Sequence, residues 1–353
     1  MNIALIAPSG ITGGVATVFH NLHRGLVSEG IHVDVIRLSE GSFPLLSAIH
    51  CDIIKARRLT GHDLALYIGS IPWPSHILAR LSGVPIALFL HGYVYHELFH
   101  EMLYGASVRN KIGAAITATM IKTAVSLNTI HLYVCPSLAV CEANKISDHF
   151  VLLPQWIFPE ELELLRTASG VKKNSMIRIV TYGSYAYSPR LLSTSHLVVL
   201  ARVMERMVKR KFELIIVDPK GRISSFGSVK IVRPMPRQEF LSLLASADLY
   251  IERGIDEDLG QVVLEAMAMG TPVAKLTHQR YWDRQDYKED LILARSFREL
   301  AEKIAEYINN LEHYYNYYSK KGREFILTKR TWDAVKKPFL EALKYTINKQ
   351  HDK

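Results

Sequence analysis

Short apolar runs alternate with helical patterns along most of the 353-residue chain. In the first half, an amphipathic stretch over 13–29 predicts a helix, and the strand-like runs are 2–7, 32–38, 64–68, 86–90 and 132–136. Strands separated by helices are typical of a parallel sheet with crossover connections. Ligands bind at the carboxyl ends of such strands, so the residues that follow these runs are the candidates for ligand contacts.

The second half repeats this alternation. Helical stretches at 195–208, 237–245 and 261–269 are interleaved with strand-like runs at 177–182, 213–217, 229–232, 249–252 and 272–276. The stretch 158–175, which contains Pro159 and several Glu residues, is typical of a linker, and we assign the linker to 161–175. We therefore predict an N-terminal Rossmann-like domain over 1–160, a second over 176–332, and a C-terminal helix and tail over 333–353. The pattern over 297–347 is helical and carries Tyr314, Tyr315, Tyr317 and Tyr318, for which packing and interfacial contacts are expected.

One stretch, residues 256–274, places a carboxylate in an apolar helix. Glu265 lies within a helix-favouring run that ends at Gly270. A buried carboxylate is costly unless donors surround it, and no basic residue lies nearby in sequence. A ligand with paired hydroxyls would be a suitable partner. The alternative is an acidic capping loop followed by a core helix.

The loop before this helix adds a second carboxylate, Glu257, eight positions before Glu265. The helix start has unpaired backbone N–H groups, which would point where an anion binds. Its residues are Leu259, Gly260 and Gln261. Two acceptors for hydroxyls that flank an anion site suit a sugar nucleotide.

The pattern Glu257-x7-Glu265, followed by Gly270 and Pro272, resembles the signature of the retaining glycosyltransferases of family 4. Residues 246–250 and 331–332 resemble further family positions. The resemblance implies the GT-B fold, an α/β fold with two Rossmann-like domains facing across a cleft, and a final helix that crosses back to the first domain. It also implies that Glu257 contacts the donor sugar and that Glu265 contacts the ribose.

Two further sites follow strands of the first half. Gly13 and Gly14 open the first helix, where glycine lets the backbone approach a phosphate, although a loop that needs positive φ explains them equally well. His91 follows the run 86–90, where it can donate to a sugar hydroxyl or stabilise charge at the reacting carbon. The resemblance implies that the Gly13-Gly14 loop lies near the donor diphosphate and that His91 contacts the donor sugar.

Cleavage of a sugar–diphosphate bond needs fixed cations when no metal is present. The family has an Arg directly after a strand-terminal glycine and a Lys several residues on. Here Gly183 is that glycine, Ser184 occupies the Arg position, and Arg190 lies close to the Lys position. One expected cation is therefore missing. Lys220 or Arg222 would compensate for it, unless they belong to a solvated turn.

Composition narrows the function classes. The net charge is +9, from 43 basic and 34 acidic residues, with clusters at 202–211 and 320–337 that either meet anionic partners or form solvated helix faces. No nucleic-acid recognition motif accompanies the charge. The spacing Gly-x-Gly-x2-Gly of NAD-binding enzymes is absent after the first strand. His96, Glu97, His100 and Glu101 match no familiar metal-ligand spacing, so we expect neither a metal nor another cofactor.

Localisation follows from three features. No signal peptide is recognisable, and Cys51, Cys135 and Cys141 show no pattern of bridges, which favours a reducing compartment. The apolar stretch 112–127 is broken by Lys122 and is too short to span a bilayer. The longer segment 107–127 also carries Arg109 and Lys111. It either lies on an anionic membrane surface or packs as an ordinary helix of the first domain. We expect a cytoplasmic protein that contacts the inner membrane face.

Together these features predict a retaining hexosyltransferase. It would move a hexose from a nucleotide-diphosphate sugar, such as a UDP-sugar, to a hydroxyl of a glycan or lipid-linked saccharide in surface polysaccharide, cell-surface glycan or N-glycan assembly. No nucleic-acid partner is expected. Because Ser184 replaces a cation, the alternative is a nucleotide-sugar-binding subunit with little activity of its own.

Overall fold

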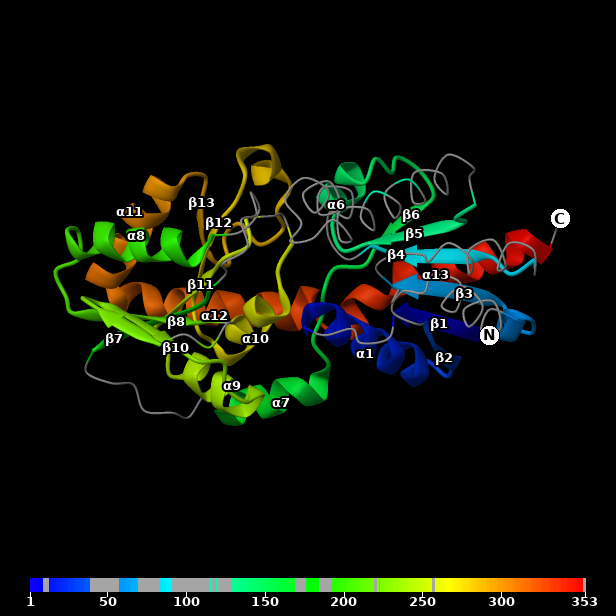
Figure 1. Cartoon of the computed structure of the whole chain (residues 1–353), viewed down its shortest axis with the longest axis horizontal. Helices are drawn as coiled ribbons and strands as arrows, with labels where there is room; N and C mark the ends of the chain where they lie inside the picture. Colours follow the sequence, from blue (N-terminus) through cyan, green and yellow to red (C-terminus); the bar gives the residue numbers. More distant parts are fainter. Residues whose placement is uncertain are drawn as a thin grey trace. The chain divides into compact units, whose positions relative to one another are not determined.

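The chain forms two compact α/β units, and each is built on its own sheet (Figure 1). Unit 1 comprises Met1–Pro154 and Val335–Lys353, and unit 2 comprises Gln155–Ala334. The computed structural model describes residues 1–8, 13–38, 57–68, 83–90, 115, 119, 129–168, 176–183, 192–218, 221, 223–255 and 258–351. The predicted α/β class with two Rossmann-like domains is confirmed.

Unit 1 contains a six-stranded parallel sheet within its described part. Its order is β2-β1-β3-β4-β5-β6. The strands are β1 (Asn2–Pro8), β2 (His32–Leu38), β3 (Leu64–Ile68), β4 (Ile86–Phe89), β5 (Leu132–Cys135) and β6 (Phe150–Leu152), and a 3-10 turn, η1 (Arg57–Leu59), precedes β3. The chain places β2 on one side of β1 and the later strands on the other. The topological switch point of this sheet therefore lies between β1 and β3.

Two helices from opposite ends of the chain belong to unit 1. Helix α1 (Gly13–Ser28) follows β1 and buries Leu22 and Leu26. Helix α13 (Trp332–His351) begins in unit 2, continues as part of unit 1, and buries Phe339 and Leu343. Nζ of Lys336 lies 2.8 Å from a carboxylate oxygen of Glu29, just beyond α1. The predicted return of the final helix to the first domain is confirmed.

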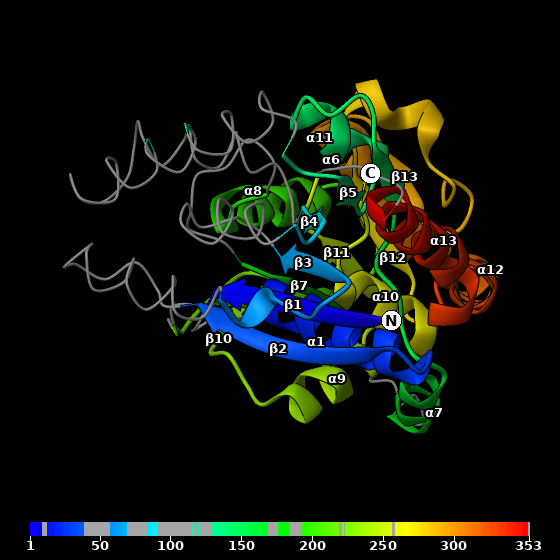
Figure 2. The same ribbon diagram turned by 90° about the vertical axis from the view of Figure 1, so that its right-hand side faces the viewer.

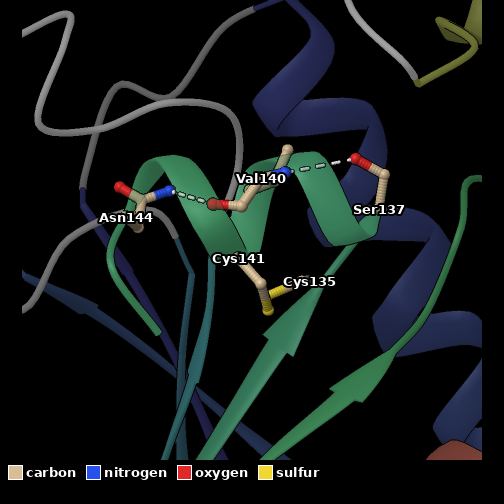
Figure 3. Close-up of a disulfide and its surroundings, with 5 residues drawn as sticks. All are labelled: Cys135, Ser137, Val140, Cys141 and Asn144. Atoms are coloured by element: carbon tan, nitrogen blue, oxygen red, sulfur yellow. Dashed lines mark hydrogen bonds between the residues drawn. A yellow bond between two sulfur atoms is a disulfide. The ribbon is translucent and has the colours of Figure 1, made fainter. Parts of the chain in front are cut away.

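A disulfide joins Cys135 to Cys141 across a sharp strand-to-helix turn (Figure 3). Ser137 caps the short helix α6 (Leu138–Ala143), because its side chain accepts a hydrogen bond from the backbone N–H of Val140. The turn brings the two Cα atoms to 5.8 Å, within the range that a disulfide spans. The prediction that the cysteines form no bridge is wrong, so the argument for a reducing compartment loses its support.

Unit 2 contains a seven-stranded sheet in the order β13-β12-β11-β7-β8-β10-β9. Its strands are β7 (Ile177–Tyr182), β8 (Phe212–Val217), β9 (Ser224–Phe226), β10 (Val229–Val232), β11 (Leu249–Glu252), β12 (Val273–Leu276) and β13 (Ile292–Ala294). All strand pairs in its described residues are parallel except β9 with β10. From β7 the chain moves outward through β8 and β10, and then returns to place β11 on the other side of β7. The switch point therefore lies between β7 and β11.

Alternating side chains of these strands pack into two separate cores. Helices of unit 2 accordingly lie on both sides of its sheet (Figure 2). In β7, Val180 faces one core while Ile177 and Ile179 face the other. One face is covered by α7 (Pro159–Ala168), α9 (Arg237–Ala245), α10 (Gln261–Met269) and α12 (Leu311–Lys329), and the other by α8 (Thr194–Glu205) and α11 (Phe297–Asn309). Apolar side chains on both faces are expected for a parallel sheet covered by helices.

The predicted linker is wrong in part. Helix α7 occupies its first half and buries Leu162 and Leu165 in the core of unit 2. Proline and acidic residues also start helices, because Pro fits the first helical turn and carboxylates favour the helix N-terminus. Just before α7, Ile157 forms a parallel bridge with Thr331, and the rings of Trp156 and Trp332 lie 5.1 Å apart. These contacts tie the two ends of unit 2 together.

Candidate functional site

The carboxyl ends of β7 and β11 meet at the switch point of unit 2. Gly183 directly follows β7, and Arg253 directly follows β11. Nη1 of Arg253 donates a 3.0 Å hydrogen bond to the carbonyl oxygen of Gly183. Because the acceptor is a neutral carbonyl, this bond itself brings no negative charge to the guanidinium. The site thus has a cation at the position where doubly wound sheets bind ligands.

Gly183 is required here by close packing. A Cβ at this position would lie 2.7 Å from Oγ1 of Thr194 and 3.1 Å from Cγ2 of Ile216. The backbone N–H of Gly183 donates to the carbonyl of Val217, at 2.9 Å. Gly183 therefore lies against both β8 and the start of α8, with no room for a side chain at this position.

Helix α10 begins at the same edge of the sheet. Its N-cap is Gly260, with φ −67° and no side-chain cap. Leu259, which precedes it, is buried in the core and fixes where the helix starts. The first backbone N–H groups of a helix point outward along its axis and carry partial positive charge. The N-terminus of α10 therefore provides donors for an anion beside Arg253.

The other end of α10 is held in place by α12. Gly270 ends the helix in the left-handed conformation, with φ +80°. Nη2 of Arg323 donates to the carbonyl of Met269 at 2.7 Å, and the hydroxyl of Tyr315 donates to the carbonyl of Gly270 at 3.2 Å. Both side chains come from α12, so two of the carbonyls at this helix end have partners.

Glu265 lies in the middle of α10 and is only 2% exposed. Its Oε1 accepts a 2.7 Å hydrogen bond from Nη2 of Arg237, the first residue of α9. Burial raises the pKa of Glu265, while Arg237 and the side-chain amide of Gln261 oppose that rise. The carboxylate is therefore held at the helix surface by a donor that is itself 59% exposed.

Tyr182, the last residue of β7, lies close enough to Glu265, Arg253 and Arg237 for their charges to shift its pKa. Burial raises its pKa first and the charge of Glu265 raises it further, whereas Arg253 and Arg237 lower it. Its ring also packs 4.7 Å from the ring of Phe240 in α9. One carboxylate, two guanidiniums and one phenol thus gather beside the start of α10.

A buried polar cluster fixes the loop that carries Arg253. Glu252 accepts hydrogen bonds from the hydroxyl of Tyr250 at 3.1 Å and from the backbone N–H of Gly254 at 2.7 Å. Lys275 on β12 is fully buried, and its Nζ donates to the carbonyl of Gly254 at 2.7 Å. Both polar groups of the Gly254 backbone are therefore held, which rigidifies the turn after β11.

The sequence-predicted site residues divide into three groups. Gly183, Leu259, Gly260, Gln261 and Glu265 lie together in unit 2, at the carboxyl edge of the sheet and in the first turns of α10. Gly13 and Gly14 start α1, next to the switch point of unit 1. Those outside the described residues are His91, Ser184, Arg190, Glu257, Lys220, Arg222, the candidate metal ligands His96, Glu97, His100 and Glu101, and the segment 107–127 apart from residues 115 and 119.

Arg237, Arg253 and Tyr182 were not predicted. Arg253 follows a strand directly, so the rule that ligands bind at carboxyl ends of strands was sufficient to find it. Arg237 is 28 residues from Glu265 in sequence, and only the packing of α9 against α10 shows that it is the donor to that carboxylate. Arg237 thus supplies a donor for the buried carboxylate that the neighbouring sequence did not reveal.

Comparison with known proteins decides the fold. The chain is similar to a glycosyltransferase from Rickettsia africae, at 17% identity over 98% of each chain with a TM-score of 0.62. It is similar to Anabaena HepE in complex with UDP and glucose, at 17% identity over 98% of this chain and 100% of that chain with a TM-score of 0.65. Sucrose-phosphate synthase from Thermosynechococcus elongatus gives 16% identity over 99% and 98% of the two chains and a TM-score of 0.64.

The chain has the GT-B fold. No protein-family model matches the sequence, and neither does any curated protein sequence. These identities are low, so the likeness establishes the GT-B architecture and leaves the chemistry to be argued from the site.

Two further observations bear on cofactors and membranes. Among the described residues, no three His, Cys, Asp or Glu side chains gather as a metal site. Metal-free chemistry stays a prediction. In the same residues, no helix has both the length and the apolar character that crossing a bilayer requires.

Proposed function

We propose that this protein is a glycosyltransferase that moves a hexose from a nucleotide-diphosphate sugar to an acceptor hydroxyl with retention of configuration. The observation that carries the proposal is Glu265, a 2% exposed carboxylate at the switch-point side of a GT-B nucleotide domain, which accepts a hydrogen bond from Arg237. HepE, which shares this fold, has been crystallised with UDP and glucose. A UDP-sugar is therefore the first donor to test.

Each group at the edge of unit 2 has a role in donor binding. Glu265 accepts hydrogen bonds from the ribose hydroxyls, and Arg237 orients the carboxylate for that purpose. The N–H groups at the start of α10 and the guanidinium of Arg253 bind the diphosphate. Gly183 packs closely against Thr194 and Ile216 and so fixes the end of β7 beside the diphosphate.

Arg253 is the candidate for the cation that Ser184 does not supply. Transfer breaks the bond between the anomeric carbon and the diphosphate oxygen, and the departing diphosphate gains negative charge. A fixed guanidinium lowers that barrier because it is already oriented when the charge develops. The hydrogen bond from Arg253 to Gly183 supports this role, because Gly183 directly precedes the position of the family's arginine.

The remaining roles belong to residues outside the described part of the chain, and to unit 1. Glu257 and His91 contact the transferred sugar, Arg190 adds a second cation on the diphosphate, and the Gly13-Gly14 loop completes the phosphate site. The acceptor is a surface polysaccharide or a lipid-linked glycan, bound at the inner membrane face. The net charge of +9 supports attachment to anionic lipid.

A thermal-shift screen of UDP-, GDP- and ADP-sugars, followed by a hydrolysis assay with the best donor, tests the proposal. A donor at about 100 times its Kd adds about 2.7 kcal/mol of stability and so raises Tm by several degrees. Glu265→Ala should abolish the shift, while Glu324→Ala, an exposed carboxylate on α12, should preserve it. If no nucleotide sugar shifts Tm, the proposal is wrong. Binding without turnover, even with acceptor lipids, favours the alternative of a nucleotide-sugar-binding subunit, which Ser184 motivates.

A further inference from the structure

Unit 2 contains a pocket of about 190 Å³ at the edge of the sheet opposite Arg253. It lies against Leu291 and Ile292, where the edge strand β13 begins. Tyr307 of α11 also lines it, and its hydroxyl donates to the carbonyl of Asp248, just before β11. The pocket thus borders the amino end of β13, and Tyr307 connects it to the amino end of β11, whereas the donor groups lie at the carboxyl ends. The two sites are separate.

Aromatic rings form one wall of the pocket. Tyr307, Tyr314 and Tyr318 come from α11 and α12, and the ring of Tyr318 lies 6.2 Å from each of the other two. Packing contacts were expected for Tyr314 and Tyr318, and these ring contacts agree with that. Packing alone does not explain why an open pocket lies beside the rings. Trp282, from the 3-10 segment η2 (Gln279–Arg284), adds an indole.

Cations fix the position of that indole. Cζ of Arg295 lies 4.1 Å from the centroid of the Trp282 ring, and the amines of Lys288 and Lys303 lie 5.0 and 5.6 Å away. Cation–π contacts of this kind hold an aromatic ring in a defined orientation. Lys303 also donates to the carbonyl of Leu293 at 2.7 Å. The pocket wall is therefore built before any ligand arrives.

The rim of the pocket carries positively and negatively charged side chains. Lys288, Lys303 and Glu306 line the pocket. Lys303 pairs with Glu299 at 2.8 Å, and Lys288 lies 3.6 Å from Asp283. Oε1 of Glu306 accepts a 2.9 Å hydrogen bond from the hydroxyl of Tyr314. Because carboxylates offset the amines, the pocket is not set up for a phosphate, yet it has donors and an acceptor around an aromatic wall.

We propose that this pocket binds one neutral sugar residue of a glycan, as a non-catalytic site. A pyranose has an apolar C–H face that packs on aromatic rings and a girdle of hydroxyls that both donate and accept hydrogen bonds. Aromatic wall and mixed-charge rim match these two features. The volume is below the roughly 300–1,000 Å³ of pockets for drug-sized ligands, which excludes a nucleotide and suits a single sugar.

This site goes beyond the proposed transfer reaction and does not depend on it. Because it lies at the opposite edge of the sheet, a glycan held there leaves the donor site of unit 2 free. Such a site would tether the protein to a polysaccharide, whether that polymer is acceptor or product.

Saturation-transfer NMR on the full chain tests this inference, with the methyl α-glycosides of glucose, mannose and galactose as probes and UDP present in excess. At least one glycoside should give a signal that persists with UDP. The double variant Lys288→Ala/Glu306→Ala should reduce that signal at least fivefold, and Glu324→Ala, an exposed α12 carboxylate outside the pocket, should leave it unchanged.

The outcomes separate this site from the donor site. The inference is wrong if none of the three glycosides gives a saturation-transfer signal. It is also wrong if UDP removes the signal or if the double variant retains it. The double variant should keep the wild-type thermal shift with UDP, which also shows that it is folded. If no nucleotide sugar binds the wild-type protein but the glycoside signal behaves as expected, the proposed function fails and the glycan site stands.

Discussion

Nη2 of Arg237 donates to Oε1 of Glu265 across 2.7 Å, and this contact joins an exposed residue to one of the most buried carboxylates of unit 2. Burial of a charge destabilises a protein unless donors compensate for it. The exposed guanidinium lies at the start of α9, where a bound nucleotide can approach both groups. The pair therefore carries a cost to folding that is explained if the carboxylate serves a ligand.

Replacement of Glu265 by Gln should raise the free energy of unfolding at neutral pH while it weakens nucleotide binding. Burial raises the pKa of Glu265 above its ordinary 4.5, so the native protein binds this proton more tightly than the unfolded chain does. The stability that Glu265 contributes is therefore lost as pH rises from 4.5 through the native pKa. Urea unfolding should show a Glu265→Gln variant that gains stability relative to wild type as pH rises from 4.5 to 7.

The same variant should bind UDP roughly tenfold to hundredfold more weakly, because a charged acceptor for the ribose hydroxyls is lost. Calorimetric titration at pH 7 measures this. Wild-type affinity in Glu265→Gln would show that the carboxylate has no part in binding. Arg237→Ala should weaken binding less, since it leaves the carboxylate in place and removes only its orientation.

Substitution of Arg253 should affect phosphate recognition and leave nucleoside recognition intact. A charge-assisted hydrogen bond is worth about 1.5–3 kcal/mol, so Arg253→Ala should weaken UDP binding roughly tenfold to hundredfold. Uridine, which lacks the diphosphate, should bind both proteins equally. Arg298→Ala is the matched control, because Arg298 is 90% exposed and pairs with Glu302 along its own helix. Equal losses for UDP and uridine would mean that Arg253 acts on the fold rather than on the phosphates.

Two glycines of the site should respond differently to alanine. A Cβ at Gly183 would meet Oγ1 of Thr194 at 2.7 Å, so Gly183→Ala should cost about 1–3 kcal/mol of stability. A Cβ at Gly260 would meet nothing within 4 Å, and φ there is −67°, so Gly260→Ala should fold with wild-type stability. If the phosphates approach Gly260, its variant should still bind UDP more weakly. Denaturant unfolding and UDP titration of both variants check this pair.

The fold was predictable because most strands are short runs of apolar residues. Runs such as 177–182, 229–232 and 249–252 coincide with β7, β10 and β11, since buried parallel strands are apolar on both faces. Strand β9 was missed because its side chains are all exposed and leave no apolar signal. Helix α7 was assigned to the linker because Pro and Glu are common to helix starts and to linkers.

The site was predictable only where it depends on local sequence. Glu265 and Gly260 belong to one helix and its cap, so spacing along the chain was sufficient to find them. The contacts from Arg237 to Glu265 and from Arg253 to Gly183 span 28 and 70 residues and arise from packing between elements. The disulfide was missed for a related reason, because a separation of six residues fits no familiar framework of bridges until Ser137 is seen to turn the chain.

That disulfide leads to a last prediction. Both Cys135 and Cys141 are fully buried, so the bridge should resist mild reductant in the native state and be reduced only when unit 1 opens. In the chain-entropy account, closing a loop with a sequence separation of 6 contributes about 2 kcal/mol, mainly by restricting the unfolded chain. Urea unfolding with dithiothreitol should therefore show wild-type protein less stable by about this amount. Cys135→Ala/Cys141→Ala should unfold identically with and without reductant, and a wild type that is equally insensitive would show that the bridge does not form in solution.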